Sequence, residues 1–240
     1  MFVSTRYRSN EAEIMDDFSM EGPMLQRTLD QIALINKRLG GNKATISGLD
    51  TILKTVPGNT VIHIADLGCG NGDMLREVAE YGRKNNRPFR LTGIDNNEFT
   101  VNYARKCSAG YPEISYVKMN VQDEEFQKLD FDIVLATLFL HHFSDTEIKH
   151  MLESLLKHTS MGIVVNDLHR SKTAYYLFRM VAGLLLNPMA RNDGAVSVLR
   201  GFKKQELIQL DKQLMNKNST IRWKWAFRFQ WIINKYERTN

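Results

Sequence analysis

Between Thr60 and Asn166 short apolar runs alternate with amphipathic stretches, and this alternation restricts the fold more than any other feature of the sequence. The apolar runs predict strands at 61–65, 90–94, 114–119, 131–140 and 162–166, and the stretches between them predict helices at 73–83, 98–106 and 145–158. The run at 131–140 is apolar almost throughout, as is typical of a central parallel strand. This rhythm predicts an α/β protein with a doubly wound open sheet and helices on both faces.

The two ends of the chain follow different patterns. Upstream, apolar residues recur every three or four positions from Leu25 to Leu39 and Gly40-Gly41 follows, which predicts an amphipathic helix with a glycine stop. A second short helix is expected at 47–54. We therefore divide the chain into an N-terminal helical cap, residues 1–56, and a sheet domain, residues 57–240.

Near the C-terminus, aromatic and aliphatic residues alternate with mostly basic ones from Ile221 to Ile233. Basic residues among aromatic ones can form a platform for nucleic acid. Strict alternation, however, points the two sets toward opposite faces of a strand. A strand pair with one buried face is therefore the preferred interpretation.

Charge and composition limit the classes of partner and the cellular compartment that we expect for this chain. The net charge is +5, but 32 basic residues are spread among 27 acidic ones, so the sequence disfavours nucleic acid as the partner. Two cysteines cannot build a disulfide framework. No run approaches the length of a transmembrane segment, and the first residues have no signal-peptide core. We expect a cytoplasmic protein, and the sequence gives no basis for assigning an oligomeric state.

A glycine-rich loop, Asp66-Leu67-Gly68-Cys69-Gly70-Asn71-Gly72, lies between the first predicted strand and the following helix. Glycines allow a tight turn and a close backbone approach to a ligand. Asp95 ends the next strand, 23 residues beyond Gly72, where such folds place a carboxylate for ribose hydroxyls. A pyrophosphate would be repelled by Asp66, so the loop favours a cationic ligand that carries an amino group.

Several segments together resemble the class I S-adenosylmethionine-dependent methyltransferases. DLGCGNGD resembles their first motif, GIDNN the acidic end of their second strand, and NVQDEEF their adenine-contacting segment. FDIVLATLFLHHFSD and GIVVNDLHRS resemble their fourth and fifth strands. The resemblance covers roughly residues 45–235. It implies a seven-stranded Rossmann-like sheet, S-adenosylmethionine as cofactor and S-adenosylhomocysteine as product.

The resemblance also implies a role for individual residues. Asp66 would meet the methionine amino group, Asp95 would accept both ribose hydroxyls, and Asn120 would lie beside the adenine amino group. Many relatives carry aspartate where this chain has Asn120, and an amide oxygen can still accept that hydrogen bond. The implied cofactor-binding set is Asp66, Gly68, Cys69, Gly70, Gly72, Asp95, Asn96, Asn120, Val121 and Thr137.

Methyl transfer from a sulfonium needs donor and acceptor in line, and it needs a base only if the acceptor carries a weakly acidic proton. His142 follows the fourth predicted strand and His169 follows the fifth, at the edge where open α/β sheets bind ligands. His142 is the first choice for that base and His169 the second. Either histidine could instead be purely structural.

Residues 170–202 form an insertion after the fifth strand and are interpreted as a helical substrate lid. Tyr175 and Tyr176 would line an apolar acceptor pocket, and Arg191 or Arg200 could hold an acidic group, although an ion pair with Asp193 is a simpler role. We expect O-methylation of a hydrophobic or aromatic small molecule such as a phenol, quinol or polyketide.

Three alternatives to this acceptor class stay open. They are C-methylation of a quinone-type ring, methylation of RNA or protein, and a non-catalytic module that only binds the cofactor. No group of His, Asp and Glu shows metal-ligand spacing in the sequence, so no metal is expected.

Overall fold

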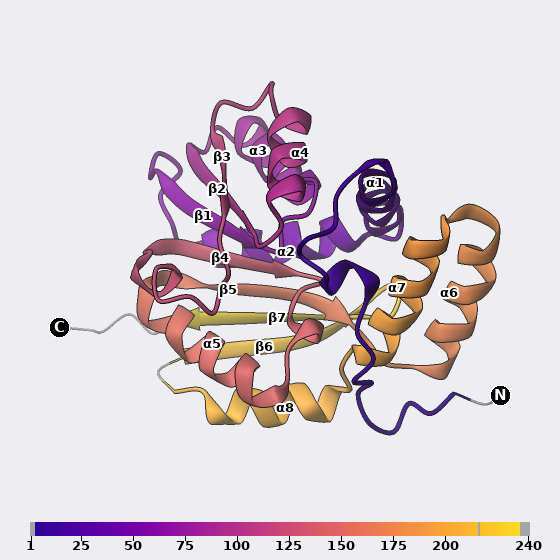
Figure 1. Cartoon of the computed structure of the whole chain (residues 1–240). Coiled ribbons are helices and arrows are strands. Elements are labelled where there is room, and N and C mark those ends of the chain that lie inside the picture. Colours follow the sequence, from indigo (N-terminus) through magenta and orange to yellow (C-terminus); the bar gives the residue numbers. More distant parts are fainter. Residues whose placement is uncertain (1–2, 216, 236–240) are drawn as a thin grey trace.

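The computed structural model describes residues 3–215 and 217–235, which form one mixed seven-stranded sheet between helical layers (Figure 1). The strand order is β3-β2-β1-β4-β5-β7-β6, in which β7 is antiparallel to both of its neighbours. The predicted doubly wound, seven-stranded α/β fold is confirmed. The strands are β1 (Ile62–Leu67), β2 (Phe89–Asp95), β3 (Ile114–Lys118), β4 (Phe131–Thr137), β5 (Thr159–Leu168), β6 (Lys217–Lys224) and β7 (Arg228–Lys235).

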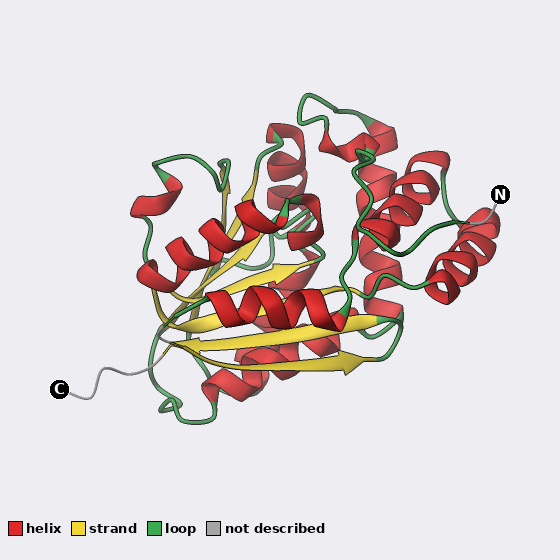
Figure 2. Cartoon of the chain, turned by 90° about the horizontal axis from the view of Figure 1, so that it is seen from below, coloured by secondary structure: helices red, strands yellow, loops and turns green. Residues whose placement is uncertain are grey.

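Helices cover both faces of the sheet (Figure 2). Helices α2, α3 and α4 bury their apolar side chains on one face, and α5 and α8 on the other. Helix α7 contacts α1 and α6 beside the sheet. The helices are α1 (Pro23–Arg38), α2 (Gly41–Leu53), α3 (Asp73–Lys84), α4 (Glu98–Cys107), α5 (Asp145–His158), α6 (Lys172–Leu185), α7 (Pro188–Arg200) and α8 (Lys204–Gln213), with short turns η1 (Ile14–Asp16), η2 (Phe126–Lys128) and η3 (Leu140–His142).

Two of the boundaries that differ from the sequence prediction have a cause in the local backbone. Helix α2 begins at Gly41 rather than at residue 47, because Gly40 adopts a left-handed φ of 76° and lets the chain reverse directly out of α1. Strand β4 ends at Thr137 rather than at 140, because Leu138 has a φ of 54° and turns the chain out of the sheet. Turn η3 follows at once, and it carries both His141 and His142 to the carboxyl edge.

The expected C-terminal strand pair is a hairpin, β6–β7. Its turn contains Ala226 and Phe227 with φ of 60° and 54°, a left-handed conformation that no glycine announces in the sequence. The expectation of one buried face is wrong for β7. This strand lies between β5 and β6, where Gln230 donates to the Ala44 carbonyl of α2 and Trp231 donates to Asp211 of α8. Both of its faces are therefore buried.

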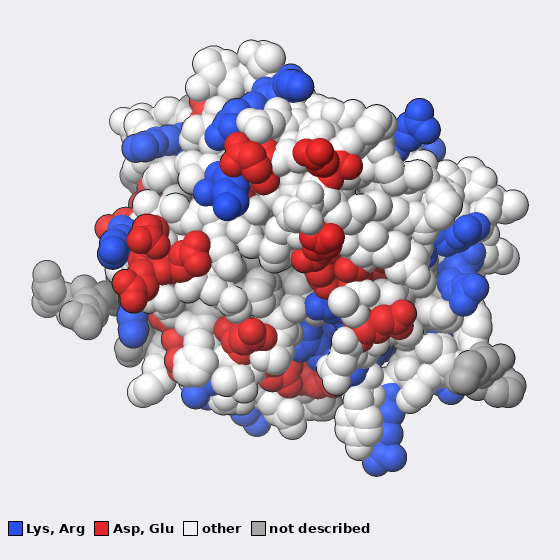
Figure 3. Space-filling view, in the orientation of Figure 1, with Lys and Arg blue, Asp and Glu red and all other residues white. Residues whose placement is uncertain are grey.

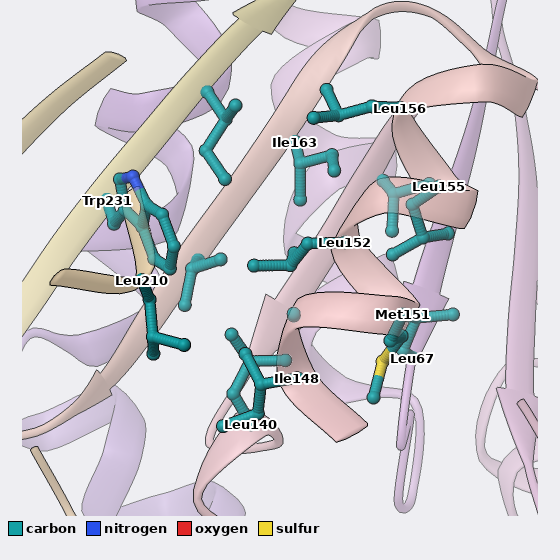
Figure 4. Packing of buried hydrophobic residues seen from close by; sticks show 14 of the residues in the cluster. Leu67, Leu140, Ile148, Met151, Leu152, Leu155, Leu156, Ile163, Leu210 and Trp231 are labelled. Atoms are coloured by element: carbon teal, nitrogen blue, oxygen red, sulfur yellow. The ribbon is translucent and has the colours of Figure 1, made fainter. Parts of the chain in front are cut away.

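The larger part of the core lies between the sheet and helices α5 and α8 (Figure 4). Leu152 and Leu156 of α5 pack near Ile163 of β5, and Leu210 of α8 lies beside the fully buried Trp231. Burial of each such side chain contributes about 1.5–3 kcal/mol. The result is a firmly packed platform under the carboxyl edge of the strands. Within the described residues, no helix is long and apolar enough to cross a membrane.

Candidate active site

The glycine loop turns from β1 into α3 through three left-handed residues. Gly68, Gly70 and Gly72 have φ values of 63°, 52° and 76°. A Cβ on Gly68 would come within 2.6 Å of the Phe139 ring, and one on Gly72 would collide with the Tyr116 hydroxyl. At Gly70 the nearest atom would be 3.6 Å away. Gly68 and Gly72 are thus required by packing, while the backbone of Gly70 faces space that a ligand can approach.

Asp95 fastens this loop to the end of β2. Its Oδ2 accepts a hydrogen bond from the Gly70 amide at 3.2 Å, and its Oδ1 accepts one from the Asn97 amide at 3.0 Å. Burial raises the pKa of the carboxyl, and these amides and the nearby His142 offset part of the rise. The predicted pairing of loop and carboxylate is therefore present, with the partly buried Asn96 next to it.

Three carboxylates gather at the loop. Burial, followed by the charges of Asp73 and Asp95, raises the pKa of Asp66 well above its usual value. Burial also raises the pKa of Asp73, which accepts a hydrogen bond from the Asn42 amide group at 3.0 Å. A cationic group placed among these carboxylates would relieve their repulsion. The donor set therefore suits a ligand that carries an ammonium or a sulfonium.

The remaining predicted cofactor residues lie along the same edge. Thr137, the last residue of β4, forms a hydroxyl–hydroxyl hydrogen bond of 2.9 Å with Thr45 of α2. The side-chain Oδ1 of Asn120 accepts from the Gln122 backbone amide at 3.0 Å, and Val121 packs against the core. The pKa of the Cys69 thiol is raised by burial, so the side chain is an apolar filler rather than a reactive group.

Replacing Gly70 by alanine should separate ligand binding from folding. The methyl group has room beside Leu29 of α1, but the left-handed φ imposes strain of about 1 kcal/mol, and we expect the new Cβ to narrow the approach of a ligand to the loop backbone. We expect at least a tenfold loss of S-adenosylhomocysteine affinity by calorimetry and a fall of a few degrees in Tm. Gly110→Ala, at a glycine with open space around it, is the matched control. Equal affinities of the two variants would contradict this placement of the loop.

An N-terminal strap, defined here as residues 13–20, lies across the carboxyl edge. The Asn97 side-chain amide donates to the carbonyls of Phe18 and Met20 at 3.0 and 2.8 Å. At the other end of the strap, the Asp193 carboxylate of α7 accepts from the amides of Ile14 and Met15. The strap is thus attached both to the residues that follow β2 and to the insertion after β5.

The adjacent histidines of η3 have different environments. His141 is buried between the Asp167 carboxylate, 2.7 Å from Nδ1, and the Glu13 carboxylate, 3.4 Å from Nε2. Burial alone would lower its pKa, but the two carboxylates outweigh burial and raise the pKa to about 9. His142 is partly exposed, and its Nδ1 lies 2.8 Å from Asp16 Oδ1. His141 is therefore a structural cation, while His142 has a ring nitrogen available to the site.

Arg200 connects the strap to η3. Its guanidinium pairs with Asp16 at 2.6 Å and donates to the carbonyls of His141 and His142. These partners occupy the side chain, which is buried, whereas Arg191 lies exposed on α7. The simpler role considered, an ion pair of Asp193 with Arg191 or Arg200, is not the one found. The Asp193 carboxylate instead accepts hydrogen bonds from the strap amides.

Glu13, His141 and His142 place one potential ligand atom each within 4.8 Å of one another. Sequence spacing gave no sign of this group, since Glu13 lies 128 positions before His141. Glu13 Oε1 and His141 Nε2 are buried and have no hydrogen-bond partner in the described part of the chain. His141 and the Arg200 guanidinium, 3.9 Å from Glu13, supply positive charge to this carboxylate, and each also faces a second one, Asp167 or Asp16. The three residues therefore belong to one connected network of charges.

The structure places the other predicted residues elsewhere. His169 lies against the β6–β7 hairpin, where its Nδ1 accepts a 3.4 Å hydrogen bond from Trp223. Burial, followed by Lys203 and Arg170, lowers its pKa. Tyr175 packs with Arg179, and Tyr176 is exposed on α6. Their proposed roles in base catalysis and acceptor binding stay predictions.

Residues 64–162, from β1 to the first half of β5, match a family model described as a methyltransferase domain. The match covers the glycine loop, Asp95 and both histidines of η3. Over these residues the chain is similar to methyltransferase domains, in agreement with the fold and the glycine loop. No curated protein matches the sequence.

Solved structures of other methyltransferases share the fold. The plantazolicin methyltransferase BpumL, solved with S-adenosylhomocysteine, has a TM-score of 0.65 at 16% identity, over 88% of this chain and 90% of that one. The magnesium protoporphyrin IX methyltransferase ChlM from Synechocystis PCC 6803 has a TM-score of 0.54 at 12% identity, over 91% and 90% of the two chains. The TM-scores show that these proteins share a fold with the chain. Because the sequence identities are low, the methyl acceptor has to be inferred from the site.

Proposed function

We propose that this enzyme transfers the methyl group of S-adenosylmethionine to an oxygen atom of a hydrophobic or aromatic small molecule. The observation that carries the proposal is the pairing of His142 with Asp16 beside the glycine loop. It supplies a base that can accept a hydroxyl proton at the edge of the sheet where the cofactor residues meet. Asp16 and Glu13 had no signal in the sequence, because they lie about 125 positions before the histidines that they contact.

The cofactor side of the site rests on the loop and Asp95. Asp95 would hold the ribose hydroxyls, while Asp66 would meet the methionine ammonium group from the end of β1. Asn120 and Val121 follow β3 and would contact adenine. When bound, S-adenosylmethionine supplies a methyl group activated by its sulfonium. The protein residues need only hold this group in line with the acceptor.

The acceptor side depends on the orientation of His142. The Asp16 carboxylate faces Nδ1 and therefore favours the tautomer in which Nδ1 is protonated and Nε2 can take a proton. Hydrogen bonds from His142 and Arg200 outweigh burial and lower the pKa of Asp16, so it is anionic at neutral pH. As an acceptor hydroxyl loses its proton to Nε2, Asp16 stabilises the imidazolium that forms.

Apolar side chains next to this pair support a hydrophobic acceptor. Phe139 lies over Gly68, and its ring centroid is 5.0 Å from that of Phe143. Both aromatic residues flank η3 and are partly buried against the core. A phenol, quinol or polyketide has the aromatic surface and the acidic hydroxyl that such surroundings suit.

Replacing His142 by glutamine should reduce kcat about 100-fold on an acceptor found by screening phenols and quinols, because the proton acceptor is lost. Affinity for S-adenosylhomocysteine should stay within a factor of three by calorimetry. Asp16→Asn should give a smaller loss of kcat, because the imidazolium that forms loses its stabilising carboxylate. His150→Gln, at an exposed histidine of α5, is the control. Equal turnover of His142→Gln and wild type at every pH would leave positioning alone as the mechanism.

A further inference from the structure

The outward face of α6 is apolar and exposed. Leu184 and Leu185 retain 85% and 66% of their accessible surface. The exposed side chains repeat at adjacent positions in every turn, so they form one stripe along the helix. The opposite side of the helix packs on α7, where Phe178 fills the space above Gly194. We call this stripe the α6 face, and it consists of Tyr176, Leu177, Met180, Val181, Leu184 and Leu185.

Positive charge accompanies this apolar stripe. Residues 168–192 contain no Asp or Glu, but they include Lys172, Arg179 and Arg191, all of which are exposed. In Figure 3 basic side chains lie at the outer edge of the molecule where Figure 1 places α6, surrounded by uncharged atoms. An apolar stripe bordered by cations and free of carboxylates is complementary to an anionic apolar surface.

A basic cavity adjoins the N-terminal end of α6. Its volume is about 440 Å³, and it is lined by Val3, Ser4, Thr5, Arg6, Lys172 and Lys203. The Val3 amide donates to the Tyr176 hydroxyl at 3.5 Å, so the cavity lies directly beside the α6 face. Three cationic side chains around one open cavity suit a phosphate group.

Helix α1 extends the same surface at the other end of α6. Gln31 of α1 accepts from the amide of Asn187, two residues beyond the end of α6. Arg27, Leu34 and Arg38 share the helix side of Gln31, because they lie three, four or seven positions from it. All three are exposed. Leucine between arginines thus continues the pattern of the α6 face.

We propose that the α6 face docks on an anionic lipid bilayer, with α6 in the plane of the interface and basic residues contacting lipid phosphates. Helix α6 has 14 residues and a length of about 21 Å, which is enough to lie in the interface and too short to span it. A two-fold dimer through this face would bring the cations of both copies together. The charge therefore favours the bilayer over a second copy. The proposal does not depend on the methyl acceptor.

Vesicle sedimentation tests the docking surface directly. Extruded vesicles of phosphatidylcholine with one quarter phosphatidylglycerol should bind the protein at least tenfold more tightly than vesicles of phosphatidylcholine alone. High salt should weaken that binding. A double variant, Leu184→Glu with Leu185→Glu, should lose at least tenfold in affinity for the anionic vesicles. Val61→Glu is the matched control, since Val61 is 65% exposed and precedes β1 at the opposite edge of the sheet.

Calorimetry with S-adenosylhomocysteine and circular dichroism show whether each variant keeps its fold and its cofactor site. The proposal is overturned if the wild type ignores anionic vesicles, or if the double variant binds them as tightly as Val61→Glu does. It is also overturned if analytical ultracentrifugation shows a dimer that the double variant dissociates while vesicle binding is unchanged, because the face would then be an interface between copies.

Discussion

Replacing Asp95 by asparagine should weaken the binding of S-adenosylhomocysteine about 100-fold, or nearly 3 kcal/mol. Hydrogen bonds to a charged acceptor contribute about 1.5–3 kcal/mol. In this variant the ribose hydroxyls would lose the negative charge of their acceptor. Asparagine keeps the size of the side chain but only one acceptor oxygen, so one of the two amides, that of Gly70 or that of Asn97, loses its acceptor. We expect a loss of about 1 kcal/mol in stability from that hydrogen bond and a folded protein. Isothermal calorimetry measures the affinity, and thermal unfolding checks the fold.

Asp132→Asn is the matched control for this variant. The Asp132 carboxylate also accepts a backbone hydrogen bond, from the His63 amide at 2.8 Å, but it lies near the amino end of β4. The control should retain wild-type affinity. If Asp95→Asn binds S-adenosylhomocysteine as tightly as the control does, Asp95 is no ribose ligand and the proposed cofactor site must be redrawn.

Raising the pH from about 6.5 to above 9 should remove about 3 kcal/mol from the free energy of unfolding, through His141 alone. Its pKa is raised from 6.5 to about 9 in the folded protein, so the folded state holds this proton more tightly than the unfolded chain. The stabilisation is complete below the unfolded pKa and disappears as the pH rises through the folded one. The pKa values of Glu13 and Asp167 are lowered, so their contribution is instead lost as the pH falls into the acid range.

Urea unfolding at intervals between pH 6 and 9.5 measures this dependence. His141→Gln should be less stable than wild type at pH 6, and it should lose less stability on the way to pH 9.5. His158→Gln, at a histidine near the protein surface, should keep the wild-type slope. Parallel curves for His141→Gln and wild type would mean that His141 is not a buried cation and that the strap is held by Arg200 and its neighbours.

The sequence predicts best what local patterns control. The helices at 73–83, 98–106 and 145–158 are confirmed to within a residue or two, because their apolar spacing is regular. The pairing of the glycine loop with Asp95 follows from two consecutive strand–helix units, whose carboxyl ends must meet. The left-handed Ala226 has no such local signal, and Gly40, which ends α1, does not by itself show that α2 begins at the next residue.

The missing parts of the site are contacts between distant segments. Asp16 orients His142 across 126 positions, and Glu13 reaches His141 across 128. In the sequence alone, carboxylates in a short N-terminal stretch are interpreted as surface charges. Only the folded structure shows that they contact η3. The sequence also could not predict that the apolar side of α6 is exposed, because a buried helix would show the same apolar spacing.

The strap has a consequence for the order in which the chain is made. Its partners Asp193 and Arg200 are synthesised roughly 180 residues after Glu13 and Asp16, so a nascent chain that ends before α7 contains the glycine loop and Asn97 but lacks the contacts that fix the strap to α7. The edge of β5 also stays unpaired until β7 leaves the ribosome. The last contacts of the strap therefore form only when the chain is nearly complete, and prematurely terminated chains would expose an open sheet edge on which they could aggregate.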